Sequence, residues 1–514
     1  MKYRLVALLF FLTIKVLSQK GTDSLLVKYN SNFERQIFLD SKEGNKTNSF
    51  ITSLFAIDSL YTIGRAEENI DEINSFFKTI ANKTNSLQGK KKTKYIFKHI
   101  HDRFFKKYDI EAYFPEIFKT GIYNCVTATA FYAYAFDYFD VPYQIKETPT
   151  HVFLVAYPEK HNIYIETTDP GKLGSFAPSE SIIKNAVDDI ISHKLITREY
   201  VNEVGYNKAF NTYYYGDENI SKTNLLGIQY YNKTIGNINK EKYKNAYYDL
   251  VKSAILYNNK KVGLLNDFLI RVILEKTDFQ KIKNFKWFLT AIENIEDKDF
   301  LKYKFNSVIF NSNFEEKELD IIEKGIFAIK KENLKTTFLE QLYSYRAEIS
   351  AKKQRQKLTL FYAEKIYSLN KDNLTAKNYI AKSKIFTLAQ KNLTEDRLSD
   401  LQKILEIYPF VKDFGDYLSY KIYLHSYLSY NSFNRDNFEN ALTHLKKVEN
   451  LIDSHSGDVG YNEQTVGNVF GAVGAYFYRK GDIDKAKKYL NMGLAHSPDN
   501  ESINRKLKLI KSDD

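Results

Sequence analysis

The sequence predicts an α+β domain followed by an all-α solenoid of helical hairpins. Strand-like segments are confined to residues 143–167, whereas apolar residues recur at helical spacing from about residue 200 to the C-terminus. The chain has 514 residues, which is too long for one ordinary hydrophobic core. It contains only 8 Pro and 21 Gly, and this composition favours long helices over a loop-rich or β-rich protein.

The first residues have the features of an export signal. Lys2 and Arg4 give a positively charged start, residues 5–14 are apolar, and residues 16–18 provide a cleavage site. No later segment approaches the ~20 consecutive apolar residues that a membrane-spanning helix needs. We therefore expect residues 1–18 to be a cleaved signal peptide. The mature protein is expected to be exported, periplasmic or secreted, without a transmembrane segment.

The overall charge does not indicate a nucleic-acid partner. The composition is 43% hydrophobic and 27% charged, as in soluble globular proteins. The net charge of +12 comes from lysines that are spread along the whole chain, and the one basic run is Lys90–Lys92. A nucleic-acid-binding protein would gather such residues into a stripe or a motif.

The spacing of apolar residues and the turn signals predict the helices and strands of the N-terminal domain. Residues 93–105 carry apolar side chains at helical spacing, and residues 125–139 form a second helix rich in small residues, which ends at Val141-Pro142. The next segments have strand character, and residues 158–162 form a turn between the last two. The predicted strands are Tyr143–Lys146, His151–Tyr157 and Ile163–Thr167.

Beyond residue 200 the clearest unit is a helical hairpin over residues 470–498. Its small and apolar positions match the tetratricopeptide repeat pattern, and weaker copies occur elsewhere. The matching positions are Phe470, Val473, Gly474, Phe477, Gly481, Ala486, Leu490, Gly493 and Pro498. This resemblance implies a tetratricopeptide-like helical repeat domain over residues 205–510 that holds a protein or peptide partner.

The single cysteine of the chain, Cys125, is followed by a histidine and an acid. His151 begins a predicted strand, and Glu166 or Asp169 ends the next one. A thiol, an imidazole and a carboxylate in this order are the parts of a cysteine nucleophile, its general base and the group that orients the base. One cysteine cannot make an intramolecular disulfide, so a special role for Cys125 would be chemical reactivity.

The predicted position of Cys125 suits a nucleophile. A cysteine at a helix N-terminus faces unpaired backbone N–H groups and the positive end of the helix dipole, which favour the thiolate. The backbone N–H of Cys125 could also stabilise an oxyanion, an effect worth about 3 kcal/mol in a dry site. Its neighbours Asn124 and Tyr123 are candidates for lining that oxyanion site.

Strand alternation separates the two candidate acids. If the hairpin turns about residues 159–160, His151 lies opposite Thr168. Glu166 is then its diagonal neighbour on the same face of the sheet, whereas Asp169 points to the other face. We therefore predict Glu166 as the third member of the triad, with Asp169 as the alternative, since a slip of one residue would reverse the assignment.

The region of residues 94–170 resembles the transglutaminase-like, papain-related superfamily. The segments that carry the resemblance are Gly121–Ala128, Val141-Pro142, His151-Val152-Phe153 and Ile165–Thr168. The resemblance implies an α+β papain/transglutaminase-like domain over residues 19–200 and a Cys-His-Glu triad without a cofactor. Members of the superfamily usually have an Asp-Pro-Thr-like sequence at this position. The acid here is Glu, as in some branches of the superfamily.

Other kinds of site find no support in the sequence. His99 and His101 are two residues apart on one helix and point to different faces, so they do not form a metal pair. No glycine-rich loop follows a strand, and nucleotide binding is not indicated. Two functions remain open: an exported thiol-dependent hydrolase or acyltransferase, and a non-catalytic protein-binding or assembly protein with a degenerate transglutaminase-like domain.

Overall fold

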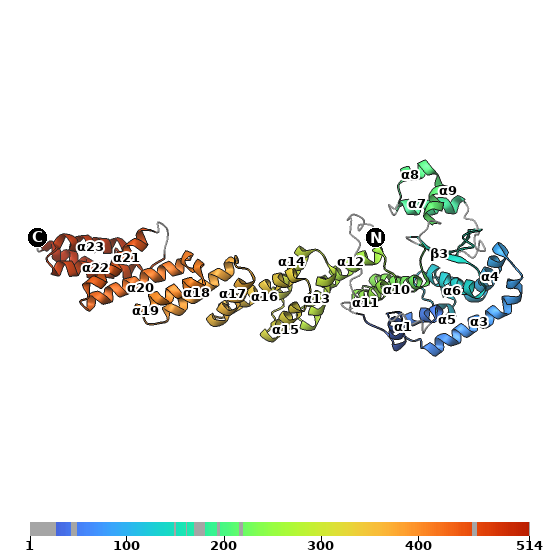
Figure 1. Cartoon of the computed structure of the whole chain (residues 1–514), viewed down its shortest axis with the longest axis horizontal. Helices are drawn as coiled ribbons and strands as arrows, with labels where there is room; N and C mark the ends of the chain where they lie inside the picture. Colours follow the sequence, from blue (N-terminus) through green and yellow to red (C-terminus); the bar gives the residue numbers. More distant parts are fainter. Residues whose placement is uncertain are drawn as a thin grey trace. The chain divides into compact units, whose positions relative to one another are not determined.

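The computed structural model describes residues 27–42, 49–148, 151–160, 162–168, 180–192, 196–214, 219–454 and 460–512. These residues form two compact units (Figure 1). The first unit comprises the described residues up to 278 together with 283–296, and the second comprises 279–282 and the described residues from 297 onward. The predicted signal peptide, residues 1–18, lies outside the described residues.

The predicted fold class, an α+β papain/transglutaminase-like domain followed by an all-α solenoid, is wrong. Helices make up 74% of the structure and strands only 4%, so the fold is all-α with two small sheets. The three strands predicted from their strand character are present, but they have only five, five and three residues. Long helices such as α3 (Ile63–Asn85) and α4 (Gly89–Phe104) occupy most of the region around them.

The first unit joins many helices to a two-stranded and a three-stranded sheet. Its remaining elements are α1 (Asn32–Lys42), α2 (Phe50–Leu54), β1 (Lys107–Tyr108), α5 (Glu116–Lys119), β2 (Ile122–Tyr123), α6 (Cys125–Tyr138), β3 (Tyr143–Glu147), β4 (Val152–Ala156), β5 (Ile163–Ile165), α7 (Glu180–Ser192), α8 (Arg198–Val204), α9 (Tyr206–Tyr214), α10 (Lys222–Asn239), α11 (Tyr243–Leu256), α12 (Lys260–Lys276) and α13 (Phe285–Asn294). Helices α10 to α13 therefore belong to the same compact unit as the predicted triad.

The three-stranded sheet is antiparallel in the order β3-β4-β5 and is covered on both faces. Leu154 and Ile165 belong to the large core that contains α6, whereas Phe153 and Tyr164 pack against α7, α8 and α9. Strand β4 is consequently buried along its whole length, which explains its continuous apolar sequence.

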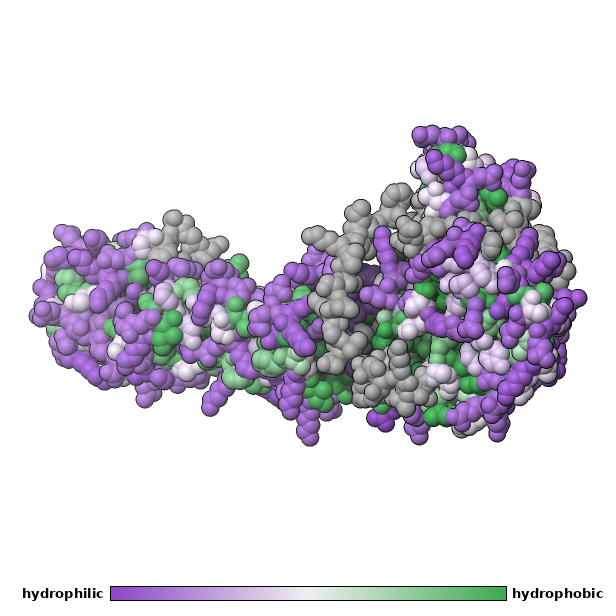
Figure 2. Space-filling view, turned by 45° about the vertical axis from the view of Figure 1, so that its right-hand side comes forward, coloured by the Kyte–Doolittle hydropathy of each residue, from purple (hydrophilic) through white to green (hydrophobic). Residues whose placement is uncertain are grey.

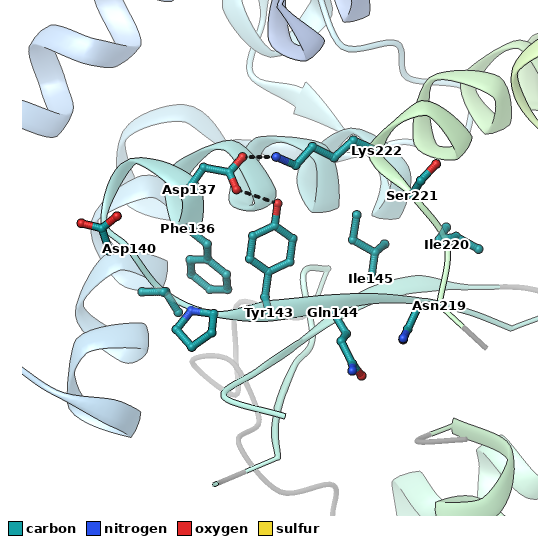
Figure 3. A pocket seen from close by; sticks show the side chains of 12 residues that line it. Phe136, Asp137, Asp140, Tyr143, Gln144, Ile145, Asn219, Ile220, Ser221 and Lys222 are labelled. Carbon is teal, nitrogen blue, oxygen red and sulfur yellow. Dashed lines mark hydrogen bonds and ion pairs between the residues drawn. The ribbon is translucent and has the colours of Figure 1, made fainter. Parts of the chain in front are cut away.

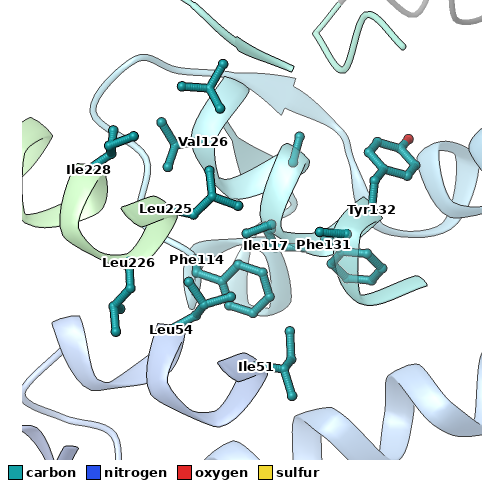
Figure 4. Packing of buried hydrophobic residues seen from close by; sticks show 14 of the residues in the cluster. Ile51, Leu54, Phe114, Ile117, Val126, Phe131, Tyr132, Leu225, Leu226 and Ile228 are labelled. Atoms are coloured by element: carbon teal, nitrogen blue, oxygen red, sulfur yellow. The ribbon is translucent and has the colours of Figure 1, made fainter. Parts of the chain in front are cut away.

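Helix α6 lies in the middle of the largest hydrophobic core (Figure 4). Almost all of its side chains are buried, because it contacts α2, α10, β3 and β4. Figure 4 shows Val126 and Phe131 of α6 among apolar side chains of α2 and α10. Each large apolar side chain buried in this way stabilises the fold by about 1.5–3 kcal/mol. The helix that begins at the cysteine is therefore a rigid support.

The second unit consists of helices in the residues that the structure describes. They are α14 (Lys298–Asn311), α15 (Glu316–Phe327), α16 (Glu332–Lys352), α17 (Gln356–Leu369), α18 (Leu374–Ala389), α19 (Asp396–Ile407), α20 (Gly415–Asn434), α21 (Phe438–Asp453), α22 (Glu463–Arg479), α23 (Ile483–His496) and α24 (Glu501–Ser512). The hairpin predicted over residues 470–498 is present as α22 and α23. A Cβ atom at Gly474 would lie 2.5 Å from Leu490 Cγ, so this glycine permits the close approach of the two helices.

None of the helices in the described part of the chain is both long and apolar enough to cross a membrane. The face of the molecule seen in Figure 2 is largely hydrophilic, with scattered hydrophobic patches.

Candidate active site

Helix α6 begins at Cys125 because the residue before it caps the helix. The Asn124 side chain accepts a hydrogen bond from Thr127 N at 3.0 Å, and Thr127 Oγ1 accepts one from Asn124 N at 2.8 Å. This reciprocal capping box satisfies two backbone N–H groups of the first turn. The thiol therefore stands at the N-terminal end of a 14-residue helix, as the sequence analysis predicted.

The neighbours of Cys125 are fully engaged in holding this turn. Asn124 Nδ2 donates hydrogen bonds to the carbonyl oxygens of Ile110 and Ala112 at 3.0 and 2.9 Å, and Asn124 is buried. Tyr123 is buried and stacks on Phe105, with ring centroids 4.6 Å apart. Both N–H bonds of the Asn124 amide are used in the contacts with Ile110 and Ala112, so its amide is not free to donate to an oxyanion.

A short parallel ladder and a strained glycine lead the chain to Cys125. Strand β2 pairs with β1, which places Tyr108 opposite Tyr123. Gly121 has a φ of +78°, and a Cβ atom there would lie 2.6 Å from Lys106 Cγ, so only glycine fits this turn.

His151 is the residue immediately before β4, and its backbone is fixed by one threonine. Thr148 N and Thr148 Oγ1 donate to His151 O at 2.8 and 3.2 Å, and His151 N donates to Thr148 Oγ1 at 3.1 Å. Thr148 is itself buried. These bonds hold the imidazole at the end of the sheet that is nearest to the start of α6.

Glu166 follows β5 and lies beside His151. The pairing of Leu154 with Ile165 continues to His151 opposite Thr168, which is the predicted register. Glu166 Oε1 lies 3.1 Å from His151 Nε2, within the distance of an ion pair. The N–H bond of Nε2 does not point straight at this oxygen, so the contact is not a linear hydrogen bond. The alternative acid, Asp169, lies outside the described residues.

Two further side chains hold the Glu166 carboxylate in place. Tyr164 OH donates to Oε2 at 2.8 Å. Thr168 donates to Oε1 from its backbone N at 3.1 Å and from its Oγ1 at 2.6 Å. These partners hold Oε1 beside His151 Nε2 and Oε2 on the Tyr164 hydroxyl group.

The pKa shifts describe a charged imidazole between the Cys125 sulfur and the Glu166 carboxylate. Burial would lower the pKa of His151, but its side-chain contacts with Cys125 and Glu166, and their negative charges, raise it to about 10. Burial would likewise raise the pKa of Glu166, but the His151, Thr168 and Tyr164 contacts lower it to about 2. The site therefore favours an imidazolium at neutral pH, flanked by a carboxylate on one side and the thiol on the other.

Tyr108, which the sequence analysis did not find, lies close enough to the site for the charges of Cys125 and Glu166 to act on its phenol, although the residue is 45% exposed. Burial raises its pKa to about 12, and the negative charges of Cys125 and Glu166 add to the shift. Its phenol is thus protonated at neutral pH and lies within electrostatic range of both groups. It was missed because β1 has only two residues, so no alternation pattern marks it.

Thr129 connects the three segments that carry the triad. It lies one turn after Cys125, and its Oγ1 donates to Val152 O at 3.1 Å and lies 3.4 Å from Thr167 Oγ1. Val152 follows His151, and Thr167 follows Glu166. Both threonines are completely buried. One hydroxyl group thereby fixes the helix against the ends of β4 and β5.

Replacing Thr129 with valine is expected to lower the free energy of unfolding by about 1 kcal/mol and to slow alkylation of Cys125 several-fold. The matched control is Thr234→Val, which removes a buried hydroxyl that donates to Tyr230 O at 2.9 Å within α10. Urea unfolding should show similar losses for both variants, whereas iodoacetamide labelling should slow only in Thr129→Val. Equal labelling rates in the two variants would remove Thr129 from the site.

A cavity of about 730 Å³ lies at the opposite end of α6 (Figure 3). Asp137 accepts a hydrogen bond from Tyr143 OH at 3.0 Å and forms an ion pair with Lys222, as the dashed lines show. Asp137 is twelve residues from Cys125, or about 18 Å along the helix. This cavity is therefore separate from the triad.

No group of three or more acidic, histidine or cysteine side chains suited to a metal ion occurs among the described residues. The closest arrangement is in the second unit, where His425 Nδ1 lies 2.9 Å from His444 Nδ1, and His444 Nε2 lies 2.7 Å from Glu395 Oε1. Burial lowers the pKa of His425 to about 3. The two Nδ1 atoms are in hydrogen-bond contact with each other, and that contact leaves no space for a metal ion between them.

A comparison of the sequence with models of known protein families finds no match, and a comparison with curated proteins finds none either. The site is therefore interpreted from its own geometry. Of the predicted residues, the structure brings Cys125, His151 and Glu166 together. It adds Tyr108, Thr129, Tyr164 and Thr168 to them.

Proposed function

We propose that this chain is a thiol-dependent hydrolase or acyltransferase that acts on amide or peptide bonds. The observation that carries the proposal is the continuous contact from the Cys125 thiol through the His151 imidazole to the Glu166 carboxylate. Three of the four segments that resemble the transglutaminase-like superfamily carry these residues. The proposal does not require an α+β papain-like domain, because one helix and two strand ends supply the three groups.

The proposed reaction proceeds through a thioester. The Cys125 thiolate attacks the substrate carbonyl carbon, and the oxyanion forms beside the backbone N–H groups at the start of α6. The His151 imidazolium then gives its proton to the leaving amine as the C–N bond breaks. In the second half, His151 accepts a proton from the incoming nucleophile, and the C–S bond breaks. Water as nucleophile gives hydrolysis, and an amine gives transamidation.

Glu166 would stabilise the positive charge of the imidazolium, and Tyr108 would stabilise negative charge near the thiolate. Glu166 stabilises the imidazolium throughout the first half of the reaction and holds the ring in its orientation. Tyr108 keeps its phenolic proton and can donate a hydrogen bond to negative charge near Cys125. We further propose an exported location and a protein-binding role for the helical hairpins, as expected from the sequence.

The proposal is tested by the pH dependence of iodoacetamide labelling. Because Cys125 is the only cysteine, the mass of the intact protein reports this site alone. Labelling of the folded protein at pH 6 should stay within a few-fold of labelling at pH 8. For an ordinary thiol with a pKa near 8.5, the labelling rate would fall on the order of 100-fold from pH 8 to pH 6.

Two controls separate a reactive thiol from an acyl-transfer site. Labelling in urea should follow the profile of an ordinary thiol, since unfolding separates Cys125 from His151. The folded protein should also take an acetyl group from p-nitrophenyl acetate, and Cys125→Ala should not. Slow labelling of the folded protein at both pH values, with faster labelling in urea, would rule out the enzyme.

A second candidate function is a non-catalytic protein-binding or assembly protein. It is favoured by a row of exposed tyrosines on α20, where Tyr423, Tyr427 and Tyr430 occupy positions i, i+4 and i+7 and are 38%, 37% and 43% exposed. This spacing places them on one face of the helix, and tyrosine is enriched at protein interfaces. Slow labelling of Cys125 in the folded protein would favour this second function.

A further inference from the structure

A second cavity of the first unit, of about 550 Å³, has an excess of hydrogen-bond donors. It lies between α10, α11, the residues that precede α1, and the segment from Ile57 to Ser59. Its walls include the aromatic rings of Tyr113 and Tyr248, and its other lining side chains are almost all polar or charged. Its volume is in the usual range for a small-molecule or peptide pocket.

The two carboxylates that line the cavity are already occupied. Asp58 accepts a hydrogen bond from Leu60 N at 2.9 Å through Oδ1, and its Oδ2 pairs with Lys119, which is not in the cavity. Asp249 accepts from Lys252 at 3.2 Å through Oδ1 and from Asn237 at 2.9 Å through Oδ2. Both carboxylates therefore have protein donors on each oxygen.

The two lysines that line the cavity have donor capacity left. Lys233 Nζ donates one hydrogen bond, to Ile57 O at 3.0 Å, and an ammonium group has three N–H bonds. Lys28 Nζ lies 5.4 Å from the centre of the Tyr248 ring. Among the described residues, no carboxylate is ion-paired with either lysine.

The side chains that line the cavity and the groups paired with them sum to one positive charge, and the charge of Lys233 acts on both Asp58 and Asp249. Lys119 neutralises Asp58, and the buried Lys252 pairs with both Asp249 and Glu34. Lys28 and Lys233 add two positive charges, while the group of Lys252, Glu34 and Asp249 has one negative charge in excess. Burial raises the pKa of Asp249, and this shift reduces the negative charge of the group that contains Lys252, Glu34 and Asp249. The Tyr113 phenol, with its pKa raised to about 12 by burial and neighbouring carboxylates, remains a neutral donor.

We propose that this cavity binds a carboxylate-bearing ligand, with the carboxylates of an acidic peptide segment on Lys28 and Lys233. The side chains of Asn30 and Asn245 line the same cavity and offer the paired donor and acceptor that a peptide group needs. Tyr113 and Tyr248 provide apolar faces for the rest of the ligand. The site is distinct from the triad, so it does not depend on the chemistry proposed for Cys125.

The test uses full-length protein and a peptide of three glutamates that carries fluorescein at its N-terminus. Fluorescence anisotropy at low ionic strength should show saturable binding, and the corresponding glutamine peptide should bind at least about tenfold more weakly. Lys28→Gln and Lys233→Gln should each weaken binding of the glutamate peptide by about tenfold. Lys28 is exposed, so its replacement does not disturb the core.

The control variant is Lys98→Gln, which makes the same change of charge at an exposed position on α4 and should leave binding within twofold. Equal binding of the two peptides, or equal binding by Lys28→Gln, Lys233→Gln and Lys98→Gln, would overturn the proposal. Absence of saturable binding would overturn it as well. Displacement of the peptide by inorganic phosphate at a lower concentration than by glutarate would assign the cavity to phosphate esters and contradict the carboxylate assignment.

Discussion

Replacing His151 with alanine is expected to slow the alkylation of Cys125 at pH 6 on the order of 100-fold. In the folded protein His151 lies between the Cys125 sulfur and the Glu166 carboxylate, and we propose that its imidazolium stabilises the thiolate form. Without it, the sulfur should react like an ordinary thiol, of which only about 0.3% is ionised at pH 6. The measurement is the pseudo-first-order rate of mass increase with iodoacetamide.

A matched control is His99→Ala, in the same compact unit. His99 lies on α4, where its ring stacks on Tyr95 with centroids 3.9 Å apart and its Nδ1 lies 2.8 Å from Tyr95 O. This variant removes a partly buried imidazole that has no contact with the triad, so its labelling rate should stay within twofold of that of the wild type. If His151→Ala also labelled at the wild-type rate, the proposed thiolate–imidazolium pair would be excluded.

The free energy of unfolding of His151→Ala should depend on pH in the direction that the two pKa shifts predict. The pKa of His151 is raised to about 10 in the folded state, above the unfolded value near 6.5. Its stabilising contribution is therefore complete below pH 6.5 and is lost as the pH rises through 10. For Glu166, lowered to about 2, the contribution is present above pH 4.5 and is lost as the pH falls toward 2. Urea unfolding should show the largest loss for His151→Ala between about pH 4.5 and 6.5.

Replacing Lys252 with methionine is expected to destabilise the first unit by about 3–5 kcal/mol. The side chain of Lys252 is completely buried on α11, where Nζ lies 2.9 Å from Glu34 Oε1 and 3.2 Å from Asp249 Oδ1. Tyr230 OH also donates to Glu34 Oε1, at 3.0 Å. Methionine keeps the length of the side chain but leaves two buried carboxylates without their counter-ion. The measurement is the free energy of unfolding in urea at pH 7.

The control for this prediction is Lys240→Met. Lys240 pairs with Glu111 at 2.8 Å, but the two side chains are 54% and 47% exposed, so the loss should stay below about 1 kcal/mol. The deficit of Lys252→Met should also shrink between pH 7 and pH 5, because protonation of Asp249, whose pKa is already raised by burial, removes part of the unpaired charge. A deficit no larger than that of Lys240→Met would show that the buried cluster contributes little to stability.

The candidate site could be predicted from short-range patterns. The strand character of three short segments located β3, β4 and β5, and the turn after Tyr157 set the register of β4 and β5. That register placed His151 and Glu166 on the same face of the sheet. In the structure, His151 Nε2 lies 3.1 Å from Glu166 Oε1. The helix that begins at Cys125 followed from the apolar and small residues after it. Each of these inferences depends on residues that are close together in the sequence.

The fold class could not be predicted in the same way. The resemblance of a few short segments suggested an α+β papain-like domain, but the strands end after three to five residues and helices surround them. The contribution of Thr129 depends on contacts with Val152 and Thr167, which lie 23 and 38 residues further along the chain. Neither the size of a sheet nor such a contact leaves a periodic signal in the sequence.

The sequence by itself determined the helices around residues 93–105 and 125–139, the three strands that follow, the hairpin of residues 470–498, and the three chemical groups of the proposed site. Period and capping are properties of neighbouring residues, so they can be read without knowledge of the fold. The tertiary structure decided which distant groups meet, as Glu34 and Lys252 do across 218 residues, and which side chains line the cavity that contains Lys28 and Lys233. Such meetings depend on how helices pack, and that packing is fixed by the whole core rather than by any one segment.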